Sequence, residues 1–170
     1  MRKRLYVIAA LFLSSLVIIT STAFSNDRLI DVSYTQLTPA AKKQVDCLAD
    51  NIYYEAGYEP DDGKKAVALV TLNRTQDDRF PKDICSVVKQ KTNSTCQFSW
   101  YCEGKKAIRN IFVYNEAREI AVHVYANYEN MRDITKGALY YHADYVNPRW
   151  KLQKTTTIGR HIFYKERDGI

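Results

Sequence analysis

Hydrophobic positions in the first half of the chain follow a helical period in two adjacent segments. The segment 39–56 predicts a helix, because one of its sides carries Ala41, Val45, Leu48, Ile52 and Ala56. Thr38-Pro39 is typical of a helix start, and Gly57 suits its end. A second helix is predicted from Asp61 to about Arg74, and its centre, residues 66–70, is apolar almost all round. Such a helix is expected at the centre of a domain.

The second half of the chain changes in character towards its end. After a turn at residues 79–81, we expect a short helix over about 82–89 and a long polar and aromatic loop over 92–104. The segment 107–129 predicts a long amphipathic helix. Residues 138–142 and 160–164 are rich in aromatic side chains and predict two strands that can pair. The pattern therefore predicts an α+β fold, mainly helical with a small antiparallel β-sheet or ribbon, over residues 38–170.

The first 25 residues read as a secretory signal rather than as part of this fold. Three basic residues precede an apolar run from Leu5 to Ile19, and small residues follow at 21–25. The run is short for a membrane span, which needs about 20 residues, so we favour a cleaved signal peptide over a signal anchor. Residues 26–37 are expected to be a linker. We therefore expect export to the periplasm, the cell envelope or the medium, with a membrane tether if the segment is retained.

The charge of the chain is only mildly basic once this segment is set aside. The formal net charge is +6, and the first 25 residues contribute three basic and no acidic residues, which leaves +3. This charge suits an anionic partner such as a cell-wall polymer, and it is too weak to indicate nucleic acid. The chain contains no G-x-S-x-G elbow, phosphate loop or dinucleotide fingerprint.

Four cysteines, Cys47, Cys85, Cys96 and Cys102, suggest two disulfides in an exported chain. Three pairings are open. A zinc site is the competing interpretation, but the nearest two cysteines are separated by five residues rather than by the usual two to four.

Glu55 is the strongest candidate for chemistry. At about 100° per residue, seven residues bring it to within roughly 20° of Leu48, on the apolar side of its helix. Loss of water favours the neutral form of a carboxyl group. A protonated acid at neutral pH is what general acid catalysis of glycosidic cleavage requires. The alternatives are a surface glutamate or a glutamate paired with an arginine.

Several neighbouring residues allow both a functional and a structural interpretation. Glu59 is either a second carboxylate of the site or a hydrogen-bond acceptor for the amides of the next helix. Arg74 is expected to serve structure, since an arginine beside Glu55 would lower its pKa. Trp100 either stacks on a sugar or packs in the core. On a strand, Tyr141 faces away from Tyr140 and His142, so only one set can face a cleft.

Three histidines, His123, His142 and His161, are the basis of a zinc amidase alternative. They are not spaced as local ligands, so we expect neither a metal nor an organic cofactor.

The chain resembles the spore cortex-lytic, SleB-type cell wall hydrolases in eight ordered blocks between Cys47 and Tyr164. The blocks include Leu48 to Ala56 with Glu55, Ala66 to Arg74, Arg79-Phe80-Pro81, Cys96 to Trp100, Gly137 to His142, Pro148-x-Trp150 and Ile158 to Tyr164. One departure is that the usual Glu-Ala-Arg-Gly-Glu reads Glu55-Ala56-Gly57-Tyr58-Glu59, without the arginine.

The resemblance implies a lysozyme-like domain in which Glu55 serves as acid and then as base. Cleavage would fall between N-acetylmuramic acid and N-acetylglucosamine of peptidoglycan, by a lytic transglycosylase or a muramidase mechanism. Candidate substrate-binding residues are Tyr54, Glu59, Asn73, Gln97, Phe98, Trp100, Tyr141, His142, Trp150 and His161. We expect a monomer. The rival functions are an N-acetylmuramoyl-L-alanine amidase and a non-catalytic wall-binding protein.

Overall fold

The computed structural model describes residues 29–93, 95–104 and 107–167. The predicted signal peptide lies outside them. Among the described residues, no helix combines the length and apolar character that crossing a membrane would require. Part of the expected linker lies against the domain. Asn127 accepts a hydrogen bond from the Ile30 amide and donates one to its carbonyl (3.0 Å), and a short 3-10 helix, η1 (Tyr34–Gln36), follows.

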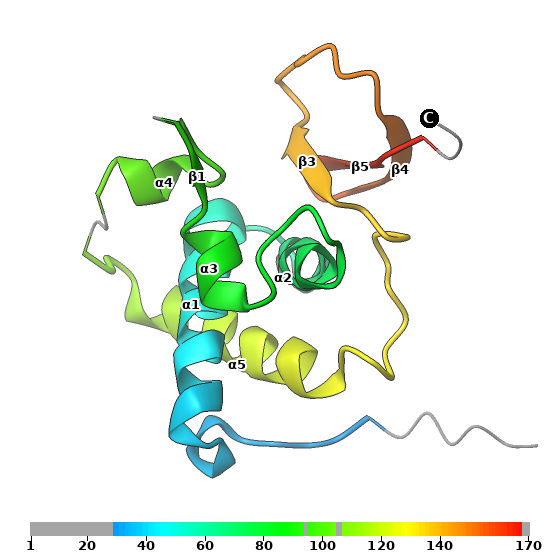
Figure 1. Cartoon of the computed structure of the whole chain (residues 1–170). Helices are drawn as coiled ribbons and strands as arrows, with labels where there is room; N and C mark the ends of the chain where they lie inside the picture. Colours follow the sequence, from blue (N-terminus) through cyan, green and yellow to red (C-terminus); the bar gives the residue numbers. More distant parts are fainter. Residues whose placement is uncertain (1–28, 94, 105–106, 168–170) are drawn as a thin grey trace, which may run out of the picture.

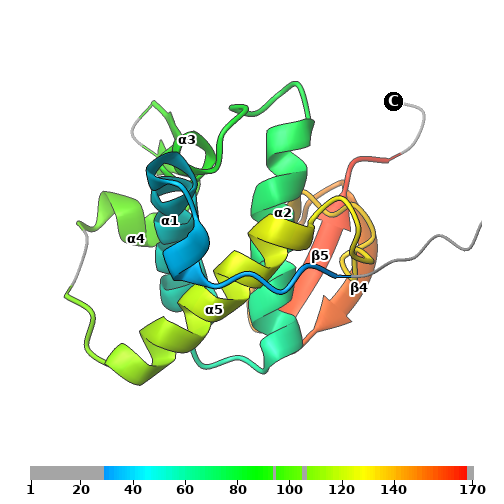
Figure 2. The ribbon, with the colours of Figure 1, turned by 90° about the horizontal axis from the view of Figure 1, so that it is seen from below.

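The three longest helices contact one another: α1 (Pro39–Ala56), α2 (Asp61–Gln76) and α5 (Ile111–Asn127). Figure 1 looks almost along α2, with α1 and α5 on two sides of it and a sheet on another. Figure 2 shows α5 running across the side of α2 that lies opposite the sheet. The middle of α2 is buried, as its apolar sequence predicted. Helix α2 is therefore the centre of the domain.

The end of α1 and the start of α5 depend in part on contacts with other elements. Gly57 ends α1 with a right-handed φ of −56°, so it is not the left-handed cap that glycine usually provides. A Cβ on Gly57 would lie 2.5 Å from the Tyr53 carbonyl oxygen of the preceding turn and 3.1 Å from a methyl group of Val113, so both α1 itself and the close approach of α5 favour glycine here. Helix α5 begins at Ile111, later than expected, because Asn110 caps it and Tyr53 Oη accepts hydrogen bonds from the amides of residues 109 and 110.

The region between α2 and α5 contains more regular structure than the predicted loop. Helix α3 (Ile84–Val88) is followed by strands β1 (Lys91–Thr92) and β2 (Thr95–Cys96), which pair, and by the single turn α4 (Ser99–Cys102). Two disulfides hold these elements. Cys47–Cys85 joins α1 to α3, and Cys96–Cys102 joins β2 to α4, so all four cysteines are paired.

The three-stranded antiparallel sheet has the order β3 (Tyr140–Ala143), β5 (His161–Lys165), β4 (Gln153–Ile158). The two predicted strands pair as β3 and β5, with Tyr141 opposite Phe163. Strand β4 was not predicted, because its sequence, QKTTTI, is mostly polar and does not alternate; the run of β-branched threonines was the available signal. The α+β fold class is confirmed.

The sheet meets the helices through Phe163, which is fully buried against Ala66 and Val70 of α2 and against Ala138. Directly opposite residues of paired strands point to the same face. Tyr141 therefore also faces the helices, and it does so next to the end of α1, where Glu55 lies.

Candidate active site

Glu55 lies in the last turn of α1, between two cavities. One cavity, of about 410 Å³, extends under the sheet and is lined by Trp100, Glu103, Tyr141 and His161 among others. The other, of about 430 Å³, lies towards the start of α5 and is lined by Tyr53, Tyr58 and Arg109. Tyr54 and Glu55 line both. A chain-like substrate that occupied both cavities would therefore pass Glu55.

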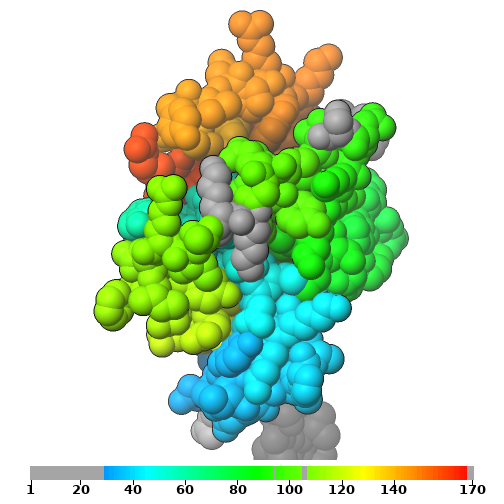
Figure 3. All heavy atoms as spheres, turned by 90° about the vertical axis from the view of Figure 1, so that its left-hand side faces the viewer, coloured from blue at the N-terminus to red at the C-terminus, as the bar shows by residue number. Residues whose placement is uncertain are grey.

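Figure 3 shows this side of the molecule from outside. The connection between β3 and β4 (orange) lies above the α4 segment (green), with the start of α5 (yellow-green) beside them and α1 (cyan) below. The site is thus built from segments far apart in the sequence.

The environment of Glu55 favours its protonated form. Burial raises the pKa of the Glu55 carboxyl group, and this is the largest effect. A hydrogen bond from Tyr141 Oη to Glu55 Oε2 (3.1 Å) and the positive charge of Arg74 oppose the rise, while the carboxylate of Glu103 adds to it. The net direction is upward. As expected of an arginine near an acid, Arg74 lowers the pKa of Glu55, but the increase caused by desolvation is larger.

Tyr141 connects Glu55 to the sheet. Its ring packs edge-on against His161, with ring centroids 5.2 Å apart, and at 5.7 Å from Phe163. Burial raises the pKa of the Tyr141 hydroxyl well above its usual value, so this hydroxyl stays a donor. Burial lowers the pKa of His161, and its Nδ1 atom is buried without a hydrogen-bond partner among the residues that the structure describes. These two side chains, both candidate substrate-binding residues, lie together in the cavity under the sheet.

Trp100 is a wall of the site. It is 9% exposed, stacks on Tyr54 with ring centroids 4.7 Å apart, and donates a hydrogen bond from Nε1 to Asn51 Oδ1 (3.1 Å). Asn51 in turn donates to Thr71 Oγ1 of α2 (3.1 Å). Since this ring is held on one face and at its edge, it shapes the cavity and cannot swing freely over a sugar.

Glu59 ties the α1–α2 connection to the β4–β5 turn. Its Oε2 accepts a hydrogen bond from the Arg160 amide (2.9 Å), and a Cβ on Gly159 would lie 2.0 Å from the same oxygen. Of the two interpretations of Glu59, the structural one is met in a different way: Glu59 accepts from the amide of the β4–β5 turn, and the N-cap of α2 is Pro60, without a side-chain cap. Glu59 does line the cavity towards α5, at the edge of the site.

Asn73 and Arg74 support the approach to β3. Asn73 Nδ2 donates to Asp133 and to the Ala138 carbonyl (both 3.0 Å). Arg74 Nε donates to the Leu139 carbonyl (2.8 Å), and its guanidinium lies 5.3 Å from the centre of the Phe98 ring. The structural role expected of Arg74 is thus observed, and it acts by placing the strand that carries Tyr141.

Other candidates lie away from Glu55. His142 stacks on Tyr164 and Trp150 packs edge-on against His142, on the face of the sheet opposite Tyr141. His142 reaches the edge of the 410 Å³ cavity, but Trp150 does not line either cavity. Neither do Gln97, Phe98 or Asn73; Phe98 is buried and Gln97 is exposed.

Sequence reasoning missed several residues that line the two cavities. Glu103 and Tyr145 line the cavity under the sheet, and Arg109 lines the other. The one sequence feature that could have pointed to Glu103 was its position next to Cys102. His123 lies on α5, apart from His142 and His161, and no group of three or more metal-ligand side chains occurs in residues 29–93, 95–104 and 107–167.

The chain matches the family of cell wall hydrolases. Residues 58–164 match that family, which is more than half of the chain, and the chain therefore belongs to it. The matched range begins just after Glu55, so the case for this residue depends on its geometry.

The resemblance to SleB-type cell wall hydrolases that the motifs predicted is confirmed by the relatives. The chain is 29% identical over 123 residues to the spore cortex-lytic enzyme of Bacillus subtilis (strain 168), covering 68% of this chain and only 35% of that relative. The catalytic domain of the Bacillus cereus SleB protein matches with a TM-score of 0.59 and 26% identity, over 73% of this chain and 91% of that domain. The catalytic domain of the germination-specific lytic transglycosylase SleB from Bacillus anthracis matches with a TM-score of 0.57 and 27% identity, over 73% and 95%.

Proposed function

We propose that this protein cleaves the glycan strand of peptidoglycan between N-acetylmuramic acid and N-acetylglucosamine, with Glu55 as a single general acid and base. The observation that carries the proposal is a carboxyl group between two cavities, in surroundings that raise its pKa. Relatives described as spore cortex-lytic enzyme and lytic transglycosylase support the substrate class.

Glu55 donates its proton to the oxygen of the glycosidic bond as that bond breaks. Positive charge develops on the muramic acid ring, and Glu55 becomes a carboxylate. The Tyr141 hydroxyl and the Arg74 charge, which oppose the raised pKa, stabilise that carboxylate. Burial thus favours the protonated acid before cleavage, and the Tyr141 hydroxyl and the Arg74 charge favour the carboxylate that cleavage leaves.

The second half of the reaction returns a proton to Glu55. In a transglycosylase, the 6-hydroxyl of the same muramic acid attacks the cationic carbon, and Glu55 takes the hydroxyl proton, which gives a 1,6-anhydro end. In a muramidase, water attacks instead. One carboxylate suffices for either route. Among the residues lining the two cavities, Glu59 is engaged with the Arg160 amide, and Glu103 is exposed on the β2–α5 segment.

The test is digestion of purified sacculi by the domain from residue 29 onwards, with the soluble products analysed by mass. Wild-type protein is expected to release disaccharide peptides, and anhydro ends identify the transglycosylase route. Glu55→Gln should lower the rate at least a hundredfold, whereas Glu119→Gln, an exposed residue of α5, should leave it unchanged. Release of free peptides from intact strands would instead identify an amidase, and no soluble product would contradict the enzyme proposal.

Action on peptidoglycan also requires the protein to be outside the cytoplasm. Export through residues 1–25 remains a prediction, and cell fractionation of the full chain tests it. The protein is expected in the envelope or medium; retention in the cytoplasm would contradict the export prediction.

A further inference from the structure

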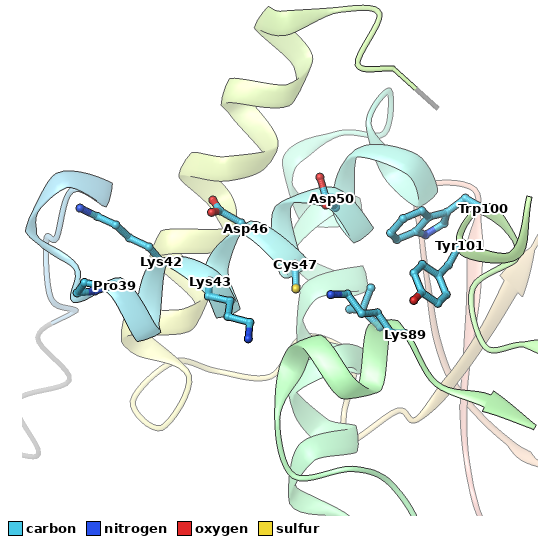
Figure 4. Close-up of a pocket in the computed structure, with 10 residues that line it drawn as sticks. Pro39, Lys42, Lys43, Asp46, Cys47, Asp50, Lys89, Trp100 and Tyr101 are labelled. Carbon is cyan, nitrogen blue, oxygen red and sulfur yellow. The ribbon is translucent and has the colours of Figure 1, made fainter. Parts of the chain in front are cut away.

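A third cavity lies outside the groove that contains Glu55, between α1, α3 and α4 (Figure 4). Its volume is about 630 Å³, larger than either cavity beside Glu55. Pro39, Cys47 and Val88 contribute apolar surface, and Trp100 and Tyr101 close one end. The Cys47–Cys85 disulfide joins two of the helices that line it. This cavity is therefore held by covalent as well as packing contacts.

The charged residues of this cavity include three ammonium groups, and the charge of one of them, Lys43, also acts on the Asp83 carboxylate. Lys42 is engaged, because it donates to the Thr35 carbonyl and lies over the Tyr34 ring. Lys43 and Lys89 are exposed, and they form no ion pair with other residues in the described part of the chain. In Figure 4, Lys43 extends from α1 and Lys89 from the end of α3. The two ammonium groups thus come from both walls of the cavity.

Two carboxylates, Asp46 and Asp50, line the same cavity, and Asp46 accepts a hydrogen bond from the Tyr34 hydroxyl (2.8 Å to Oδ1). Figure 4 shows them on the side of α1 opposite Lys43. A polymer of uniform negative charge would be repelled by this pair. A short ligand that carries carboxylates together with an amine, on a partly apolar backbone, matches both signs of charge and the apolar surface.

The cavity adjoins the catalytic groove. Trp100 lines both, so its indole ring is a common wall between this cavity and the one under the sheet. In peptidoglycan, short peptides with free carboxylates and amines branch from muramic acid. Four extended residues reach about 13 Å. A peptide that leaves a strand bound in the groove can therefore pass the edge of Trp100.

We propose that this cavity binds the uncrosslinked peptide branch of the substrate, with Lys43 and Lys89 holding its carboxylates. The proposal rests on the proposed function, because the strand in the groove brings the peptide to the cavity. Binding of the peptide would give the enzyme a preference for strands that still carry their peptides.

The direct test is a titration of ¹⁵N-labelled wild-type domain with the free tetrapeptide, followed by NMR. The chain has two tryptophans, which give two indole N–H signals. The Trp100 signal should move on binding, and the Trp150 signal, from a residue that does not line this cavity, should not. In Lys43→Gln/Lys89→Gln, half-saturation should require about three- to tenfold more peptide, since exposed charge pairs are individually weak. If Trp100 does not respond, or the double variant binds as wild type does, the proposal is wrong.

Kinetics separate this proposal from the proposed function. Uncrosslinked glycan strands are assayed with their peptides and after enzymatic removal of the peptides. The double variant should lose about three- to tenfold in kcat/KM on peptide-bearing strands, mainly through KM, and nothing on bare strands. The control Lys65→Gln/Lys154→Gln removes equal charge elsewhere and should match wild type on both. Equal losses on both substrates would overturn the peptide proposal, while failure of wild type to cut the glycan of either substrate would count against the proposed function.

Discussion

The hydrogen bond from Tyr141 to Glu55 gives the sharpest test of the mechanism. Tyr141→Phe removes only the hydroxyl, which lies 3.1 Å from Glu55 Oε2. The ring contacts with His161 and Phe163 remain available to phenylalanine. The change therefore acts on the acid with little effect on the packing of β3.

The size of the effect follows from the charge of the acceptor. A hydrogen bond to a charged group contributes about 1.5–3 kcal/mol. Glu55 becomes charged as its proton leaves, so this contribution is lost from the transition state, and kcat should fall about 10- to 150-fold. The same bond lowers the pKa of Glu55, so its removal raises that pKa further. The alkaline limb of the pH–rate profile, where the acid is lost, should move to higher pH.

Initial rates on uncrosslinked strands across a pH series measure both effects. Tyr140→Phe is the matched control: it lies on the same strand but on the opposite face, where its hydroxyl donates to Glu166 (2.9 Å), and it should keep the wild-type profile. A lower kcat without any movement of the alkaline limb would mean that Tyr141 does not act through Glu55. An alkaline limb that moves to lower pH would refute the reasoning altogether.

Three further predictions concern stability, each measured by thermal melting. Gly159→Ala should destabilise the domain by about 1–3 kcal/mol, because φ is +55° and the added methyl group meets Glu59. Gly137→Ala should cost less, because φ is +76° but the added methyl group meets only open space. Equal losses of stability would contradict the steric argument. Cys47→Ala/Cys85→Ala should lower stability by about 4 kcal/mol, the loop entropy for a separation of 38 residues, and an unchanged melt would rule out this bond. A raised pKa in the folded state means that folding favours protonated Glu55, so stability falls as pH rises from the unfolded pKa to the folded one. Glu55→Gln should remove this loss and melt higher than wild type at pH 7, with a smaller gain at pH 4; a variant that melts lower at pH 7 would contradict the raised pKa.

Local patterns predicted the helices and the place of Glu55 well. The period of apolar residues around Leu48 depends only on the geometry of one helix, so it can be read without a partner. The limits of that approach appear at Gly57 and at the start of α5. Contacts from other elements contribute at both places: a Val113 methyl group at Gly57 and the Tyr53 hydroxyl at the start of α5. Strand β4 was missed for a related reason, since its residues become a strand by pairing with β5.

Most of the site was decided by contacts between distant segments. Tyr141 and Glu55 are 86 residues apart, and Glu59 and Arg160 are 101 apart. The disulfide pairing was equally open, because spacing allows three pairings and only the packing of α3 against α1 brings Cys85 to Cys47.

The sequence by itself determined where the main helices form and which carboxyl group loses water. The tertiary structure alone decided that this group lies between two cavities, that a tyrosine donates to it, and that a buried arginine near it does not abolish its raised pKa. The physical reason is range. Helical periodicity depends on neighbours within a few residues, whereas desolvation, hydrogen bonding and charge at Glu55 depend on every segment that folds around it.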